Sequence, residues 1–208
     1  MRADPKRLAL EVHQIIRGHY KLVTSCIEAA YLFQRAALNL GEDVRRSVAQ
    51  VMAYSPLLAE EIAKGKTIEE CSDLAGKPGY WAVAVGYPES ASDRFGASDR
   101  RRNRYVGHVV CTVEDRDHML VIDPSADQMN RPLYGLKIDE PVVSRVPRLT
   151  RHILLRSDDG VMISYDLFPD MPLPLPRTQA WLDRQARVLA DRVRSTERRS
   201  IHRLVRSA

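Results

Sequence analysis

The stretch from residue 26 to residue 40 carries apolar side chains at helical spacing, which predicts one buried helix early in the chain. The apolar positions are Cys26, Ala29, Ala30, Phe33, Ala37 and Leu40. Gly41 supplies a helix stop. Ser25, just before this stretch, and Glu28, within it, form a capping-box pattern, in which each side chain satisfies a backbone N–H of the first turn. The sequence therefore predicts a helix whose first residue is Cys26.

A cysteine at the first position of a helix has a distinctive electrostatic setting. The partial positive charge of the helix end favours the thiolate over the thiol, and free backbone N–H groups there could hold a developing oxyanion. A buried cysteine is nevertheless usually an inert apolar side chain. The position alone leaves both a nucleophilic and a structural role open for Cys26.

Two short β-rich segments lie further along the chain, at residues 107–113 and 118–123, with the charged turn 114–117 between them. This pattern predicts an antiparallel hairpin. Pairing about the turn brings His108 and Asp123 together near the open end of the hairpin. A thiol, a histidine and an aspartate in these places form a nucleophile, a base and a group that orients the base.

The order of cysteine, histidine and aspartate on a helix and two neighbouring strands resembles the transglutaminase-like branch of the papain-like cysteine enzymes, which includes the arylamine N-acetyltransferases. The resembling segments are 26–40, 107–113 and 118–128, and residues 122–128 look like the aspartate motif of small bacterial members. Many members carry an aromatic residue shortly after the histidine, where this chain has two valines. The resemblance implies an α+β fold, in which a papain-like core packs an N-terminal nucleophile helix on an antiparallel sheet.

Other residues compete for roles in this site. His118 is the rival base, but it lies beside the turn, and Asp127 is the rival orienting group, in a loop. Gln128 could donate a hydrogen bond to a substrate, with capping of its loop as the alternative. Gln14 precedes the thiol as an oxyanion-hole glutamine does in papain-like proteases, but at a different spacing.

A long polar segment at residues 87–104 leads into the His108 strand. Segments of this length within a compact domain are often functional, and this one ends in an arginine-rich run that includes Arg104. We expect it either to overhang the site, with Arg104 contacting substrate, or to be a solvated insertion.

The rest of the chain predicts a catalytic domain over residues 1–168, a proline-rich linker at 169–176 and an arginine-rich helical tail at 177–208. Further helices are expected near 8–16, 57–63 and 67–74, and strands near 44–54, 80–86, 142–146, 152–155 and 161–165. The tail carries nine arginines against three acidic residues, a net charge of +6, so the rest of the chain contributes −1 to the total of +5. Its apolar stripe, with Trp181 and Leu189, is expected to belong to a separable helix beyond a semi-rigid linker, and packing back on the main body is the competing arrangement.

The three cysteines, at positions 26, 71 and 111, are too few and too widely spaced for a disulfide framework, which favours the reducing cytoplasm. No apolar run of membrane-spanning length occurs, and the first residues do not resemble a signal peptide. Zinc-ligand spacings and glycine-rich nucleotide loops are absent, so we expect neither a metal nor a cofactor.

Two functions from different classes follow. The first is a cysteine-dependent acyl-transfer enzyme with Cys26, His108 and Asp123 as its triad, most simply a peptidase or amidase acting on a protein or peptide. The second is an interaction module, in which the arginine-rich helix binds nucleic acid or an acidic protein partner, or pairs with a second copy of the chain, and the thiol site is vestigial.

Overall fold

The computed structural model describes residues 3–20, 25–74, 76–85 and 107–206, with side chains described as far as residue 196. Four helices and seven strands make an α+β fold, as the sequence predicted. The helices are α1 (Pro5–His19), α2 (Cys26–Asn39), α3 (Pro56–Ala63) and α4 (Gln179–Arg206). The strands are β1 (Arg45–Tyr54), β2 (Ala82–Val85), β3 (His108–Glu114), β4 (His118–Asp123), β5 (Val142–Pro147), β6 (His152–Arg156) and β7 (Met162–Phe168).

The seven strands form one antiparallel sheet in the order β5-β4-β3-β1-β7-β6, with β2 also paired to β1. The long strand β1 is central because it has three partners. Its first half pairs with β3, its second half pairs with β2, and its other edge pairs with β7. The predicted hairpin β3–β4 is confirmed, and β6 and β7 form a second hairpin.

The sheet is strongly curled. β4 and β7 are three strand spacings apart in sheet order, which is about 14 Å across a flat sheet. In a flat sheet their side chains would stand perpendicular to it and remain apart. Yet the Tyr165 hydroxyl on β7 lies 3.2 Å from Oδ2 of Asp123 on β4. The sheet is therefore curved so that side chains on the inner face of these two strands meet.

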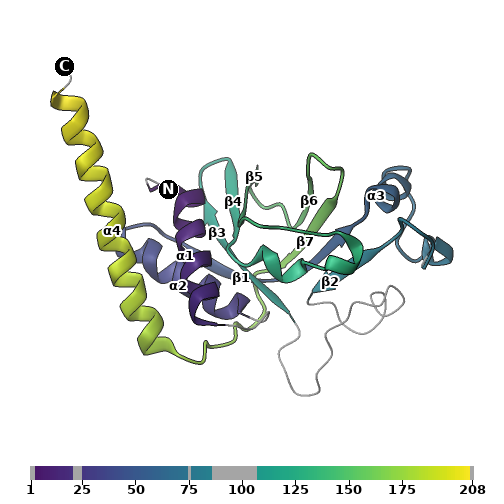
Figure 1. Cartoon of the computed structure of the whole chain (residues 1–208), viewed down its shortest axis with the longest axis horizontal. Helices are drawn as coiled ribbons and strands as arrows, with labels where there is room; N and C mark the ends of the chain where they lie inside the picture. The colour runs from purple at the N-terminus through teal and green to yellow at the C-terminus, as the bar shows by residue number, and fades with distance from the viewer. Residues whose placement is uncertain (1–2, 21–24, 75, 86–106, 207–208) are drawn as a thin grey trace.

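Helices α1, α2 and α4 lie together on one side of the sheet, and α3 lies at its other end (Figure 1). Helices α1, α2 and α4 pack closely on one another and on the sheet, because the inner face of α2 is rich in alanine, whose small side chain lets neighbouring backbones approach. Ala29, Ala30, Ala36 and Ala37 are all fully buried there. Strand residues Val109, Cys111 and Ile122 complete the same apolar cluster.

The C-terminal helix is part of this cluster. Leu182, Ala186, Leu189 and Val193 of α4 are buried in it, together with residues of α1 and α2. The ring of Trp181 stacks on His19 with their centroids 3.9 Å apart. This is the second of the two arrangements considered for the tail, in which the helix packs back on the main body, while its last turns extend past the body (Figure 1).

Two of the expected elements are shorter than predicted. Residues 67–74 form turns with a single 3₁₀ turn at Ser72–Leu74, in place of a short helix. The capping box of that segment is nevertheless made, because Thr67 N–H donates to Glu70 and Glu70 N–H donates to Thr67. Of the strand expected at residues 80–86, residues 82–85 form β2, residues 80 and 81 precede it, and residue 86 lies outside the described residues.

Candidate active site

Helix α2 begins at Cys26, as predicted, but the predicted capping box does not form. Ser25 is the N-cap residue, and its side chain makes no capping hydrogen bond. The cap comes instead from Gln128, in the 3₁₀ turn Ala126–Met129 that follows β4. With its amide oxygen toward the helix, Gln128 accepts hydrogen bonds from the backbone N–H of Cys26 at 2.7 Å and of Ser25 at 2.9 Å.

This cap has two consequences for the predicted roles. In this orientation the N–H of Cys26 is bonded to Gln128, and the expected part of the helix-end N–H groups in an oxyanion site stays a prediction. Gln128 is 7% exposed, and its amide oxygen caps the start of helix α2, whereas the sequence suggested either substrate binding or capping of its own loop.

Glu28, the other half of the predicted capping box, has a different partner. Its carboxylate accepts a hydrogen bond from Nε of Arg177 at 3.1 Å, although Glu28 itself is almost fully buried. Arg177 lies just before α4. The ion pair therefore ties the start of the C-terminal helix to the first turn of α2.

His108 and Asp123 lie side by side at the open end of the β3–β4 hairpin. Ile122 pairs with Cys111, which places Asp123 beside Val110 and points its side chain to the same face as that of His108. The Nε2–H of His108 donates to Oδ2 of Asp123 at 2.8 Å, and neither side chain is exposed to solvent. The predicted pairing of these two residues is confirmed.

The second ring nitrogen of His108 faces the thiol. Nδ1 is buried and has no hydrogen-bond partner that meets full geometric criteria among the described residues. Nε2 is taken by Asp123, and Cys26 lies close enough to the ring to raise the pKa of His108. The Cys26 sulfur also lies 3.9 Å from the carbonyl oxygen of Gly107. The three predicted residues are therefore neighbours in space.

Burial and charge act in opposite directions on His108. Burial lowers the pKa of the imidazole, because the charged form loses its hydration. The carboxylate of Asp123, its hydrogen bond and the adjacent Cys26 thiol raise the pKa more strongly, to about 10. The raised pKa favours the imidazolium form of the ring at neutral pH.

Asp123 is held by Ser125 and Tyr165, and no role was predicted for either from the sequence. Oδ1 accepts hydrogen bonds from Ser125, from the backbone N–H at 3.0 Å and from the hydroxyl at 3.2 Å. Oδ2 accepts one from the Tyr165 hydroxyl in addition to the one from His108. The Ser125 contact is an Asx-type turn, which the Asp-Pro-Ser order could have indicated. Tyr165 lies 42 residues away on another strand, and only the curl of the sheet brings it close.

The rival candidates lie elsewhere. His118 is exposed at the far end of β4, 3.3 Å from Arg145. Asp127 is 3.7 Å from both His13 and Arg17 on α1. Gln14 is exposed on α1. Arg104 and the rest of the segment 87–104 lie outside the described residues.

The other two cysteines have no acid–base partner of this kind. Cys111 is fully buried and donates to the carbonyl oxygen of Ala30 at 3.3 Å, and burial raises its pKa far above the usual range. Cys71 is also fully buried, and burial raises its pKa too. Both are protonated at neutral pH, which suits a structural role.

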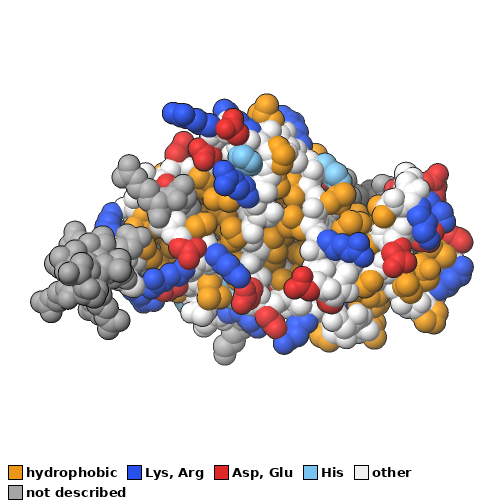
Figure 2. All heavy atoms as spheres, turned by 90° about the horizontal axis from the view of Figure 1, so that it is seen from above, with side chains coloured by type: hydrophobic (Ala, Val, Ile, Leu, Met, Phe, Trp, Pro, Cys, Tyr) orange, Lys and Arg blue, Asp and Glu red, His pale blue; other side chains and the backbone are white. Residues whose placement is uncertain are grey.

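Three arginines in and just before the C-terminal helix are bound within the molecule. Arg177 pairs with Glu28, Arg192 with Glu11 on α1, and Arg194 with Asp191 and the carbonyl oxygen of Asn39. On the face seen in Figure 2, the charged side chains of the described surface have both signs, interspersed. Binding of nucleic acid or an acidic partner by the arginine-rich helix therefore stays a prediction, with fewer free guanidinium groups than the sequence suggested.

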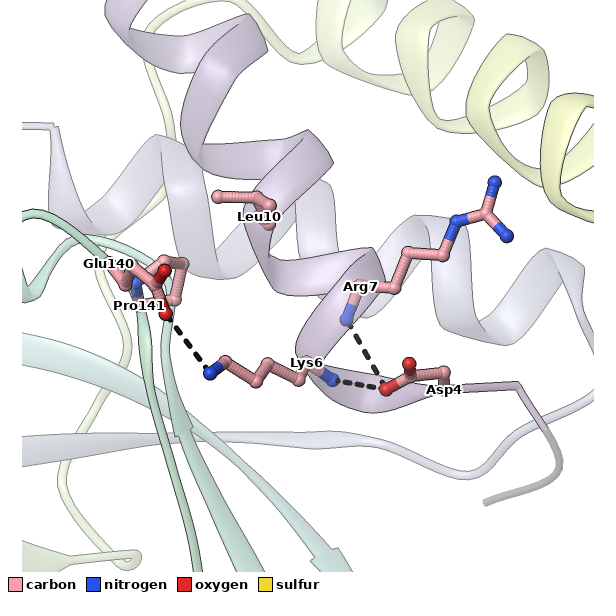
Figure 3. A pocket seen from close by; sticks show the side chains of 6 residues that line it. All are labelled: Asp4, Lys6, Arg7, Leu10, Glu140 and Pro141. Carbon is pink, nitrogen blue, oxygen red and sulfur yellow. Dashed lines mark hydrogen bonds and ion pairs between the residues drawn. The ribbon is translucent and has the colours of Figure 1, made fainter.

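One shallow pocket of about 240 Å³ lies away from the thiol, between the first turn of α1 and the loop before β5 (Figure 3). Lys6 and Glu140 form an ion pair across it at 3.0 Å, and Asp4 caps α1 beside it. Among the described residues, no cluster of three His, Cys, Asp or Glu side chains is arranged to hold a metal ion. Within the same residues, no helix has the length and apolar character needed to cross a membrane.

Comparisons with known proteins add no relative to this description. A scan against protein-family models, a search of curated proteins and a search of solved structures all find no match to the chain.

Proposed function

We propose that this protein is a cysteine-dependent acyl-transfer enzyme of the transglutaminase-like, papain-like type, in which Cys26, His108 and Asp123 act as the catalytic triad. The observation that carries the proposal is the fully buried His108–Asp123 pair beside the thiol. Burying an imidazolium and a carboxylate is costly even when they are paired. A role in nucleophilic catalysis explains why this costly pair is buried next to a thiol on a helix N-terminus.

The proposed reaction proceeds in two steps. The Cys26 thiolate attacks the carbonyl carbon of an amide, and the His108 imidazolium protonates the departing amine, which leaves an acyl thioester on Cys26. His108 then takes a proton from an incoming water molecule, whose oxygen displaces the sulfur and releases the acid. Asp123 holds the ring so that Nδ1 faces the sulfur in both steps.

Water as the second substrate makes the enzyme a peptidase or amidase, and an amine makes it a transferase. We propose hydrolysis of a protein or peptide, because the resemblance is to enzymes that act on such chains. All three cysteines are free thiols, which suits the reducing cytoplasm proposed from the sequence.

Hydrolysis of a fluorogenic peptide library tests this function. We expect wild-type protein to release amine from a subset of peptides, and Cys26→Ala to lower that rate at least about a thousandfold, as loss of a triad nucleophile does. Added hydroxylamine should capture the acyl group as a hydroxamate, because it competes with water for the acyl thioester.

Cys71→Ala is the matched control, since Cys71 is buried in a separate apolar cluster. It should retain wild-type turnover once any loss of folded protein is accounted for. Turnover that persists in Cys26→Ala would remove Cys26 from the mechanism, and no turnover of any library peptide by folded wild-type protein would exclude a peptidase.

A further inference from the structure

Gln128 connects the two halves of the proposed triad. The chain leaves β4 at Asp123, and Ser125 binds the carboxylate of Asp123 two residues later. Three residues further on, Gln128 binds the first two N–H groups at the start of α2. One short turn therefore holds both the group that orients His108 and the residue that carries the thiol.

The chemistry of this cap is unusual. Helix N-termini are normally capped by a nearby Ser, Thr, Asp or Asn, and an acidic side chain there gains from the helix dipole. Ser25 occupies that position but makes no side-chain bond. The acid of the first turn, Glu28, is bound by Arg177. A neutral amide from a different part of the chain takes the N–H groups instead.

We propose that Gln128 is a positioning residue that holds Cys26 against His108, and that its neutrality preserves the positive helix end for the Cys26 thiolate. This inference rests on the proposed function. An amide oxygen satisfies the N–H groups of Ser25 and Cys26 without adding charge. A carboxylate in the same place would satisfy them equally well, but would put a full negative charge next to the sulfur and oppose its ionisation.

Two substitutions separate the cap from the charge. Gln128→Glu keeps an acceptor oxygen and adds the charge, whereas Gln128→Met keeps the approximate size and removes the acceptor. Gln14→Glu is the matched control, since it makes the same charge change on the exposed side of α1. The readouts are the melting temperature and the rate of Cys26 alkylation by iodoacetamide against pH, followed by peptide mapping.

We expect Gln128→Glu to melt close to wild type while its alkylation profile moves up by about one pH unit, which is about tenfold slower labelling at pH 6. Gln128→Met should melt several degrees lower and label Cys26 more slowly at every pH, because two buried N–H groups lose their acceptor. Gln14→Glu should match wild type in both measurements.

A wild-type alkylation profile in folded Gln128→Glu would overturn the role of neutrality, and wild-type behaviour of Gln128→Met would overturn positioning altogether. Amide hydrogen exchange of the wild-type protein gives a test that needs no variant. The Ser25 and Cys26 amides should be protected, and fast exchange at both would contradict the cap. Neither test uses a substrate. The role of Gln128 can therefore be judged even if no peptide is hydrolysed, and the hydrolysis test can be judged even if Gln128 has no such role.

Discussion

Replacing His108 by Gln should lower the rate of Cys26 alkylation at pH 6 by up to about 300-fold. Only the thiolate reacts, and an ordinary thiol with a pKa near 8.5 has about one molecule in 300 ionised at pH 6. In the proposed mechanism, the imidazolium of His108 stabilises the thiolate form of Cys26. Glutamine removes the base but keeps an N–H for Asp123, so the buried carboxylate retains a donor. The measurement is the rate of iodoacetamide labelling at each cysteine, followed by peptide mapping.

His118→Gln is the control for this result. His118 is the rival base from the sequence and lies exposed at the other end of β4. Its replacement should leave the labelling rate of Cys26 unchanged. Equal loss in both variants, or no loss in His108→Gln while it remains folded, would show that His108 does not activate the thiol.

Replacing Leu189 by Ala should destabilise the whole protein, with a loss of about 2–5 kcal/mol in the free energy of unfolding. Leu189 is 1% exposed and belongs to the same apolar cluster as α1 and α2. For a chain of this size, the loss corresponds to a melting temperature roughly 5–15 °C lower. Thermal unfolding followed by circular dichroism measures it.

The neighbouring residue provides the control. Val188 lies on the same helix but is 48% exposed, and Val188→Ala should change the free energy of unfolding by less than about 0.5 kcal/mol. Truncation before Arg177 should have a larger effect than Leu189→Ala, since it also removes Leu182 and the ion pair with Glu28. A truncated protein that melts like wild type would instead support a separable tail.

The parts of the fold that follow from local pattern were predictable from the sequence. Helix α2 follows from the spacing of its apolar residues, and the β3–β4 hairpin follows from two β-rich runs around a polar turn. The pairing of His108 with Asp123 depends only on that hairpin's register, so it was predictable too. The position of Cys26 at the first residue of its helix came from the same local signals.

The parts that depend on distant contacts were not predictable. The Ser/Thr-x-x-Glu pattern occurs at Ser25 and at Thr67, and only the second forms a capping box. At the first, Gln128 and Arg177 reach the helix from other elements and replace the local bonds. Tyr165 reaches Asp123 because the sheet curls, and curl has no simple sequence pattern. In each of these cases the structure depends on a contact between residues far apart in the sequence, which local patterns do not indicate.

The ionisation of His108 tests the central claim most directly. Nitrogen-15 NMR of the imidazole rings, with His108→Gln to identify the signal, should show both ring nitrogens of His108 protonated at pH 7.5, with loss of the proton near its pKa of about 10. Alkylation of Cys26 removes the thiolate, so the same titration should then move to lower pH. A neutral His108 ring at pH 7.5 that does not respond to alkylation of Cys26 would contradict a thiolate–imidazolium pair, and with it the proposed enzyme.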